Sequence, residues 1–295
     1  MIDYAYYPGC SVKSSAKHYE ESILPVFREL GVNLNEVEDW NCCGATATPS
    51  VDKSKTSALN GRILALAEKD NGSLIAPCAA CYLSLKKSHL FLSGGSKEAQ
   101  KILDALKTQG LEYKGDVQVK HPLEVLTGEI GLDKIKDRVT RPLSGLRVAS
   151  YYGCQIVRPY ADFDDAENPT TMDDIIAALG ADPVDYSAKT RCCGGALTAN
   201  IEEVGIELNY LLLKEAKRKH ADVFVTLCPL CLFNLEISQS KVNKKYKQDL
   251  HTPVLFFSQL MGLAFGLSKE SMGFQRSLIP LDAMWNKIES GGNNE

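Results

Sequence analysis

The feature that most constrains this chain is a set of ten cysteines that divides into two groups of five with nearly the same spacing. The first group is Cys10, Cys42, Cys43, Cys78 and Cys81, and the second is Cys154, Cys192, Cys193, Cys228 and Cys231. The last four cysteines of the two groups are 150 positions apart, and the first ones are 144 apart. A repeat of this kind indicates a duplicated domain with a six-residue insertion in its second copy.

Residues around the cysteines repeat as well. Tyr-Pro-Gly-Cys matches Tyr-Gly-Cys, and Asn-Cys-Cys-Gly-Ala matches Arg-Cys-Cys-Gly-Gly-Ala. The glycines of the Cys-Cys-Gly motifs, Gly44 and Gly194, have no side chain and are expected to let backbone come close to a cluster sulfur. Between the two copies, residues 141–147 contain a proline and a glycine, which often separate structural segments. We therefore predict an N-terminal domain at 1–145, a C-terminal domain at 146–290 and a disordered polar tail at 291–295.

Each half alternates short apolar runs with amphipathic segments. Strands leading into cysteine loops are predicted at residues 2–7, 73–76, 148–152 and 223–227. Amphipathic helices are predicted at residues 17–30, 56–68, 172–179 and 202–219, and further helices after each C-x-x-C pair. This alternation predicts an α/β fold in which each half is a small parallel-sheet unit with its cysteine loops at the strand ends.

Composition argues against several classes of protein. A net charge of −4 and a pI near 5.8 give no reason to expect nucleic-acid binding. The longest apolar stretch, at 253–267, is too short for a membrane span and is expected to be a buried helix. The N-terminus lacks a signal peptide, so we expect a cytoplasmic protein whose cysteines serve metal or redox chemistry instead of disulfides.

Five thiols in each half narrow the choice of metal. A structural zinc ion takes four ligands, usually from two separated pairs, and a thioredoxin-like dithiol would use only the C-x-x-C pair. An ordinary cubane [4Fe–4S] cluster also takes four thiolates. The fifth thiol is therefore spare, or it belongs to a more open cluster with several irons. Zinc and a dithiol are the less favoured alternatives.

The pattern C-x31-CCG-x33-CxxC, followed by C-x37-CCG-x33-CxxC, resembles the CCG-domain (cysteine-rich domain) family. That family includes the B subunit of heterodisulfide reductase and iron–sulfur subunits of glycolate, lactate and some succinate or fumarate oxidoreductases. The stretches most similar to this B subunit are 151–160, 166–169, 191–196 and 228–235. Methanogenic members often have proline after the first Cys-Cys pair, where this chain has Gly44, so the resemblance extends to related proteins outside methanogenesis.

The resemblance implies two non-cubane [4Fe–4S] clusters, one held by each group of five cysteines, facing each other across a substrate crevice. It implies a disulfide reductase that cleaves CoM-S-S-CoB or a related small or protein-borne disulfide. Electrons would come from two partners, a flavin-containing subunit of the A type and a ferredoxin-like iron–sulfur subunit of the C type. This chain itself has no Gly-rich dinucleotide fingerprint, so neither flavin nor nicotinamide is expected on it.

A different class of function is an electron relay. A relay protein would pass electrons between a flavoprotein and a quinone or other acceptor, as part of a hydroxy-acid or succinate/fumarate oxidoreductase. The fifth cysteine favours substrate chemistry, because a relay needs only four-ligand clusters.

His121 is the one candidate for acid–base chemistry outside the cysteines. It stands in a segment, 119–126, that aligns with residues 251–256 of the second half. A histidine near its ordinary pKa can protonate a departing thiolate, so a proton-donor role is considered. A structural role is more common for such a residue, and it is expected for the other four histidines.

Overall fold

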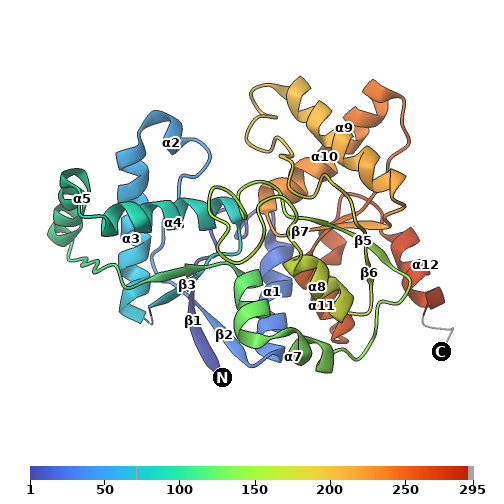
Figure 1. Ribbon diagram of the computed structural model, residues 1–295, viewed down its shortest axis with the longest axis horizontal. Coiled ribbons are helices and arrows are strands. Elements are labelled where there is room, and N and C mark those ends of the chain that lie inside the picture. Colours follow the sequence, from blue (N-terminus) through green and yellow to red (C-terminus); the bar gives the residue numbers. More distant parts are fainter. Residues whose placement is uncertain (71, 292–295) are drawn as a thin grey trace.

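The computed structural model describes residues 1–70 and 72–291, and each half contains a four-stranded parallel sheet (Figure 1). The first sheet has the order β2-β1-β3-β4 and the second has the order β6-β5-β7-β8. The strands of the first are β1 (Ile2–Tyr6), β2 (Val32–Glu36), β3 (Ser73–Ile75) and β4 (Gln118–Lys120). Those of the second are β5 (Arg147–Tyr151), β6 (Asp182–Pro183), β7 (Val223–Thr226) and β8 (Val254–Phe256). The prediction of two homologous α/β units is confirmed.

Helices connect the strands within each half. The first half contains α1 (Lys17–Glu29), α2 (Thr48–Val51), α3 (Lys53–Asp70), α4 (Ala79–Ser93), α5 (Lys97–Thr108), α6 (Pro122–Glu124), the π-helix η1 (Val125–Ile130) and α7 (Leu132–Asp137). The second half contains α8 (Thr171–Ala178), α9 (Glu202–Arg218), α10 (Pro229–Tyr246), α11 (Phe257–Ala264), the 3-10 helix η2 (Phe274–Arg276) and α12 (Asp282–Gly291). The predicted strands and helices are thus confirmed, with small shifts at their ends.

The apolar stretch 253–267 is not one buried helix, so that prediction is wrong in part. Its first residues form β8, which pairs with β7, and α11 begins only at Phe257. A continuous apolar run does not distinguish a buried strand from a buried helix. Here the first residues of the run pair with the edge of β7 and so form a strand. Of the predicted tail, Gly291 ends α12, and residues 292–295 lie outside the described part of the chain.

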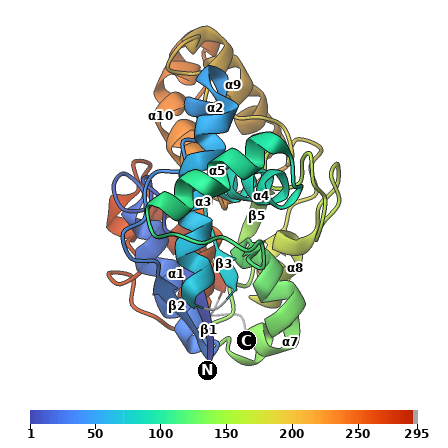
Figure 2. The same cartoon turned by 90° about the vertical axis from the view of Figure 1, so that its left-hand side faces the viewer.

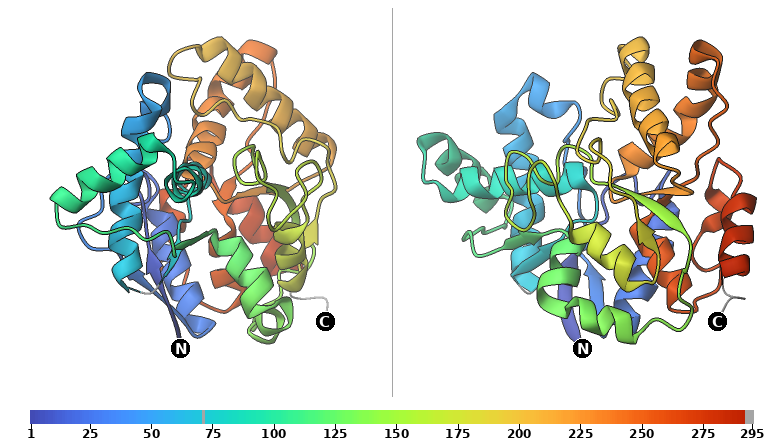
Figure 3. Two further views of the ribbon diagram at one scale, coloured as in Figure 1. Left: turned by 60° about the vertical axis from the view of Figure 1, so that its left-hand side comes forward. Right: turned by 45° about the vertical axis from the view of Figure 1, so that its right-hand side comes forward.

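The two halves pack against each other through α1 and α11 (Figure 1). Tyr19 of α1 stacks on Phe256, with ring centroids 3.9 Å apart and planes 4° apart. Nearby, the buried hydroxyls of Ser22 and Ser258 lie 2.7 Å apart and share a hydrogen bond. The halves therefore share a core at this contact, and α2 and α9 project on the same side of the molecule (Figures 2 and 3).

The helices are short or polar compared with membrane-spanning ones. Within residues 1–70 and 72–291, none of them combines the length and the apolarity that crossing a bilayer requires.

Candidate metal centre

The cysteines of each group come from three loops that follow parallel strands. In the first half, Cys10 follows β1, the Cys42–Cys43 pair follows β2, and Cys78 and Cys81 lie at the start of α4, after β3. The second group follows β5, β6 and β7 in the same way. Because the carboxyl ends of parallel strands meet at one edge of a sheet, these three loops converge.

The sulfur atoms of the first group lie close together. The Sγ atoms of Cys43 and Cys81 are 3.2 Å apart, and those of Cys42 and Cys10 are 3.8 Å apart. The neighbouring thiols of Cys42 and Cys81 lower the pKa of Cys43. Cys43 and Cys81 are buried, whereas Cys10 and Cys42 are exposed. The group therefore has a buried side and a side open to solvent.

The second group has the same arrangement. The Sγ atoms of Cys193 and Cys231 are 3.4 Å apart, and both residues are buried. The neighbouring thiol of Cys154 lowers the pKa of Cys192 to about 6. Cys192 is exposed and Cys154 is half-buried. None of these cysteines, nor any in the first group, is in a disulfide.

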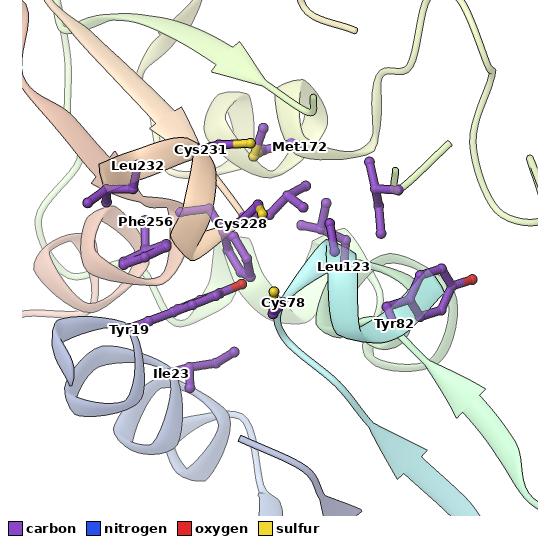
Figure 4. Close-up of a cluster of buried hydrophobic side chains, with 14 of the residues drawn as sticks. Tyr19, Ile23, Cys78, Tyr82, Leu123, Met172, Cys228, Cys231, Leu232 and Phe256 are labelled. Carbon is purple, nitrogen blue, oxygen red and sulfur yellow. The ribbon is translucent and has the colours of Figure 1, made fainter. Parts of the chain in front are cut away.

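The two groups meet at Cys78 and Cys228, as the close-up in Figure 4 shows. These residues are the N-caps of α4 and α10, and each is only 4% exposed. Each thiol lies close enough to the other to shift its pKa. The neighbouring thiols of Cys231 and Cys78 lower the pKa of Cys228, and the neighbouring thiol of Cys228, together with burial, raises the pKa of Cys78. No feature of the sequence predicts this contact.

Glycines allow the backbone to pass close to the sulfurs. Gly9 and Gly153 have φ values of +75° and +70°, in the left-handed region that favours glycine. A Cβ atom at Gly9 would lie 3.1 Å from Sγ of Cys81, and one at Gly153 would lie 3.4 Å from Sγ of Cys231. These two positions leave little room for a side chain beside the thiols.

The glycines after the adjacent cysteine pairs were expected to bring backbone close to a sulfur. The N–H of Gly44 donates to Sγ of Cys42 at 3.4 Å, and the N–H of Gly194 donates to Sγ of Cys192 at 3.2 Å. The approach of backbone to a cluster sulfur stays a prediction. Backbone N–H donors of this kind stabilise negative charge on sulfur.

Two buried tyrosines tie the loops together, and no role was predicted for them. The hydroxyl of Tyr7 donates to the carbonyl of Asn41 at 3.0 Å, and that of Tyr151 donates to the carbonyl of Arg191 at 2.6 Å. Each tyrosine lies three residues before the first cysteine of its group, and each accepting residue directly precedes the adjacent pair. Their equivalent positions in the two copies of the repeat are the sequence feature that could have identified them.

The second site has a further anchor, built around Lys189. Its Nζ atom lies 3.1 Å from Oδ2 of Asp173, and the hydroxyl of Tyr152 donates to the same oxygen at 2.8 Å. The carbonyl of Lys189 accepts the N–H groups of Tyr152 and Gly153 at 3.0 and 3.1 Å. Burial raises the pKa of Asp173, although Lys189 opposes the shift. The network holds the end of β5 where the first cysteine loop begins.

His121 is fully buried at the end of β4. Its Nε2 atom is 2.9 Å from the carbonyl of Pro77, and its Nδ1 atom accepts the N–H of Leu123 at 3.2 Å. Burial lowers the pKa of His121 to about 4. Both ring nitrogens thus bind the main chain, and the proton-donor role stays a prediction.

The expected alignment of residues 119–126 with 251–256 is wrong in register, because the strand pairing makes His121 equivalent to Phe256. Ile75 of β3 pairs with Lys120, and the equivalent residue Val225 of β7 pairs with Leu255. The next residues, His121 and Phe256, are therefore equivalent. A strand ladder determines this register, whereas the sequence offered only a shared histidine and proline.

A cavity of about 520 Å³ is lined by residues that neighbour cysteines of both groups in sequence, although none of the ten cysteines lines it. Its wall includes Ala45 and Ala80 from the loops of the first group and Gln155, which directly follows Cys154. The remaining lining residues are Pro49, Lys53, Ser54, Thr56, Ser57, Leu83, Ser84, Lys87, Ser88 and Phe91.

A larger and more open cavity, of about 1020 Å³, borders the second site alone. Cys154 and Cys192 form part of its wall. Its charged lining residues are Arg158, Arg191, Arg218, Lys219, Glu167, Asp185 and Glu215. The two cavities therefore differ in polarity, and the neighbouring residues Cys154 and Gln155 line one each.

The donor set of each half fits an iron–sulfur cluster. Five free thiols converge from three loops, backbone N–H groups point at sulfur, and glycines keep side chains away. In the described part of the chain, no three or more Cys, His, Asp or Glu side chains are arranged around one metal-ion position. The sulfurs instead form a series of neighbouring pairs.

Known proteins share this sequence pattern. The family model of the CCG cysteine-rich domain matches residues 4–86 and 148–236. The membrane anchor subunit of an 8-methylmenaquinol:fumarate reductase of Wolinella succinogenes is 34% identical, over 94% of this chain and 97% of its own length. The B subunit of a CoB–CoM heterodisulfide reductase of Methanosarcina acetivorans is 31% identical, over 95% of this chain and 94% of its own. A protein of Archaeoglobus profundus, described as similar to the B subunit of heterodisulfide reductase, is 30% identical, over 92% and 93%.

Among solved structures, a hypothetical protein from Helicobacter pylori superposes with a TM-score of 0.75 at 15% identity, over 94% of this chain and 52% of that one. This likeness concerns the fold alone. The sequence matches go further, because they span nearly the whole chain and include both cysteine groups. This protein therefore belongs to the CCG cysteine-rich domain family, as a member similar to the B subunit of heterodisulfide reductase.

Proposed function

We propose that this chain is the catalytic subunit of a heterodisulfide reductase-like complex and reductively cleaves a disulfide. The substrate would be CoM-S-S-CoB or a related small or protein-borne disulfide. The reaction breaks one S–S bond, consumes two electrons and two protons, and releases two thiols. Each group of five cysteines would hold one non-cubane [4Fe–4S] cluster, which supplies redox-active iron that can bind sulfur.

The cavity of about 520 Å³ is the observation that carries this proposal. Ala45 and Ala80 belong to loops of the first group of cysteines, and Gln155 follows Cys154 of the second. A disulfide bound in this cavity would therefore lie next to loops of both groups, which supports cleavage into two thiols. Lys53 and Lys87 add positive charge to a largely apolar wall, which suits a disulfide with an anionic group.

The contact between Cys78 and Cys228 supports the use of both groups on one bond. The buried residues Cys78 and Cys228 would keep the two ligand sets close together. Residue type alone suggests His121 as a proton donor for the departing thiolates, whereas its contacts favour the positioning role argued below.

Partner subunits would supply the electrons. We propose a flavin-containing partner of the A type and a ferredoxin-like iron–sulfur partner of the C type, with no flavin or nicotinamide on this chain. Ten cysteines free of disulfides support a reducing compartment, and so a cytoplasmic location.

A second candidate is an electron-relay protein within a quinol-linked fumarate or succinate oxidoreductase. The relative from Wolinella succinogenes favours it, because its name specifies menaquinol and fumarate. The same cavity supports it as well, since Pro49, Leu83 and Phe91 can border an aromatic ring.

The two candidates are separated by adding a disulfide enriched in a magnetic sulfur isotope to the anaerobic, partly reduced protein. We expect its sulfur to broaden the paramagnetic resonance signal of the clusters through contact with iron. Filling the cavity with Ser57→Phe should remove the broadening at unchanged iron content, whereas Ser50→Phe, outside the cavity, should not. A paramagnetic resonance signal that is unchanged by the disulfide but changes with a menaquinol analogue would favour the relay.

A further inference from the structure

A buried carbonyl next to Cys78 accepts two side-chain hydrogen bonds. The hydroxyl of Tyr19 donates to the carbonyl of Pro77 at 3.2 Å, and Nε2 of His121 lies 2.9 Å from the same oxygen. Tyr19 and His121 are both 0% exposed. Since Pro77 directly precedes Cys78, both side chains bind the peptide group that carries this cysteine.

The role of His121 as a donor follows from its other ring nitrogen. Nδ1 accepts the N–H of Leu123 at 3.2 Å, so it carries no proton. In a neutral imidazole the proton then resides on Nε2, which donates to Pro77. A carbonyl oxygen has two lone pairs, and here Tyr19 and His121 occupy both.

Tyr19 connects this carbonyl to the second half of the chain. Its ring stacks on Phe256, and the edge of Phe257 meets it at a centroid distance of 6.0 Å. Figure 4 shows the ring beside Phe256, with its hydroxyl end directed toward Cys78 and Cys228. The position of the Pro77 carbonyl is therefore linked to the half that contributes Cys228.

The second site cannot form the same pair of bonds. Phe256 occupies the position equivalent to His121, and a phenylalanine has no hydrogen-bond donor. The carbonyl equivalent to that of Pro77 belongs to Leu227. In the second half, the aromatic ring at this position instead packs against Tyr19 of the first half. At equivalent positions of the two halves, His121 therefore binds the Pro77 carbonyl and Phe256 packs against Tyr19.

We propose that Tyr19 and His121 are positioning residues: they fix the Pro77 carbonyl and so hold Cys78 beside Cys228. On this view His121 contributes a hydrogen-bond donor, not a proton for the substrate. The inference rests on the proposed cluster of the first half, but not on the identity of the substrate. Its evidence is the distances from Tyr19 and His121 to the Pro77 carbonyl, the complete burial of both side chains, and the stacking of Tyr19 on Phe256.

Three substitutions in the anaerobic full-length protein distinguish a positioning role from a proton-donor role. Tyr19→Phe removes the hydroxyl and keeps the stacked ring. His121→Phe removes the donor and places the residue of the second half at this position. His121→Gln retains an N–H donor but cannot act as an acid at neutral pH. Tyr113→Phe is the matched control, since it removes a buried hydroxyl bound to Nδ1 of His89 at 2.6 Å in a contact that involves no cysteine.

We expect Tyr19→Phe and His121→Phe to shift one of the two cluster signals in the paramagnetic resonance spectrum, with iron content unchanged. His121→Gln should retain the spectrum of the parent, and Tyr113→Phe should shift neither signal. In a Cys43→Ser background, where only the second cluster is expected, Tyr19→Phe should have no effect on the remaining signal.

Two results would overturn the inference. One is an unshifted spectrum in both Tyr19→Phe and His121→Phe at full iron content. The other is a His121→Gln variant that loses turnover several-fold while its spectrum is unchanged, which would make His121 the proton donor. The spectra are recorded without a disulfide, so the shift does not depend on disulfide binding. A protein that shows the shift but does not bind a disulfide would contradict the proposed substrate and leave the positioning role standing.

Discussion

The two cysteine sites share one backbone design and differ in how it is supported. Distances between equivalent sulfurs agree closely, at 3.2 Å for Cys43–Cys81 and 3.4 Å for Cys193–Cys231. Both sites use a tyrosine and a left-handed glycine at equivalent positions. The cysteine geometry therefore follows from features present in both copies of the domain.

Supporting contacts differ at the loops that follow the first strand of each sheet. Lys189, Asp173 and Tyr152 form a buried network in the second half, whereas Pro8 and Asp39 stand at the positions of Tyr152 and Lys189 in the first. The six-residue insertion lengthens the second loop between its first cysteine and the adjacent pair. We infer that the longer loop needs this anchor, and that the shorter loop of the first half does not.

The largest expected effect comes from removing one cysteine of a buried pair. Cys43→Ser and Cys193→Ser should each lower the iron content from about eight to about four per chain, because the two ligand sets share no residue. Metal analysis and the paramagnetic resonance spectrum of each anaerobic variant provide the measurement. Loss of all iron from either single variant would show that the contact at Cys78 and Cys228 makes the sites interdependent.

Breaking the anchor of the second site should have the next largest effect. Lys189→Met leaves the carboxylate of Asp173 buried without its partner, which should lower the free energy of unfolding by about 3–5 kcal/mol. The signal of the second cluster should also broaden. Lys241→Met is the matched control, because its pair with Glu202 is more than half exposed, and it should cost about 1 kcal/mol or less. If urea unfolding gives the same loss of unfolding free energy for Lys189→Met and Lys241→Met, the buried network does not anchor the loop.

A smaller, pH-dependent difference involves the helices that follow the C-x-x-C pairs. Glu236 of α10 occupies the position of Lys86 in α4, and burial raises its pKa to about 7. It accepts hydrogen bonds from the Ser277 hydroxyl at 2.9 Å and the Leu278 N–H at 3.2 Å. The native state then binds this proton more tightly than the unfolded state does, so stability should fall as the pH rises from about 4.5 to about 7.

Glu236→Gln should remove this dependence, which amounts to roughly 3 kcal/mol at most. Urea unfolding of parent and variant at about pH 5 and about pH 8 provides the comparison. The exposed substitution Glu207→Gln is the control and should retain the slope of the parent. A Glu236→Gln variant with the parent's pH slope would locate the dependence elsewhere.

Much of the fold was predictable from the sequence because the duplicated spacing carries two kinds of information. It defines which cysteines belong together, and it aligns each strand with its equivalent in the other half. Strands that lead into Gly-Cys or C-x-x-C loops were found for this reason. The run at 253–267 was misassigned because apolar residues alone do not show where β8 ends and α11 begins.

Contacts between the halves were not predictable. Cys78 meets Cys228, and Tyr19 meets Phe256, across sequence separations that no local pattern reports. His121 illustrates the same limit, since its environment depends on strand register and on the Pro77 carbonyl. Residue type suggested a proton donor there, whereas the observed contacts suggested the positioning role proposed above.

The central claim is that each half holds its own iron–sulfur cluster through its five cysteines. Metal analysis of the anaerobically purified full-length protein tests it most directly, with the cysteine variants beside it. We predict about eight irons per chain, with matching acid-labile sulfide, if each half holds four of each. Stoichiometric zinc with little iron would contradict it, and would replace the proposed reductase with a metal-bound scaffold.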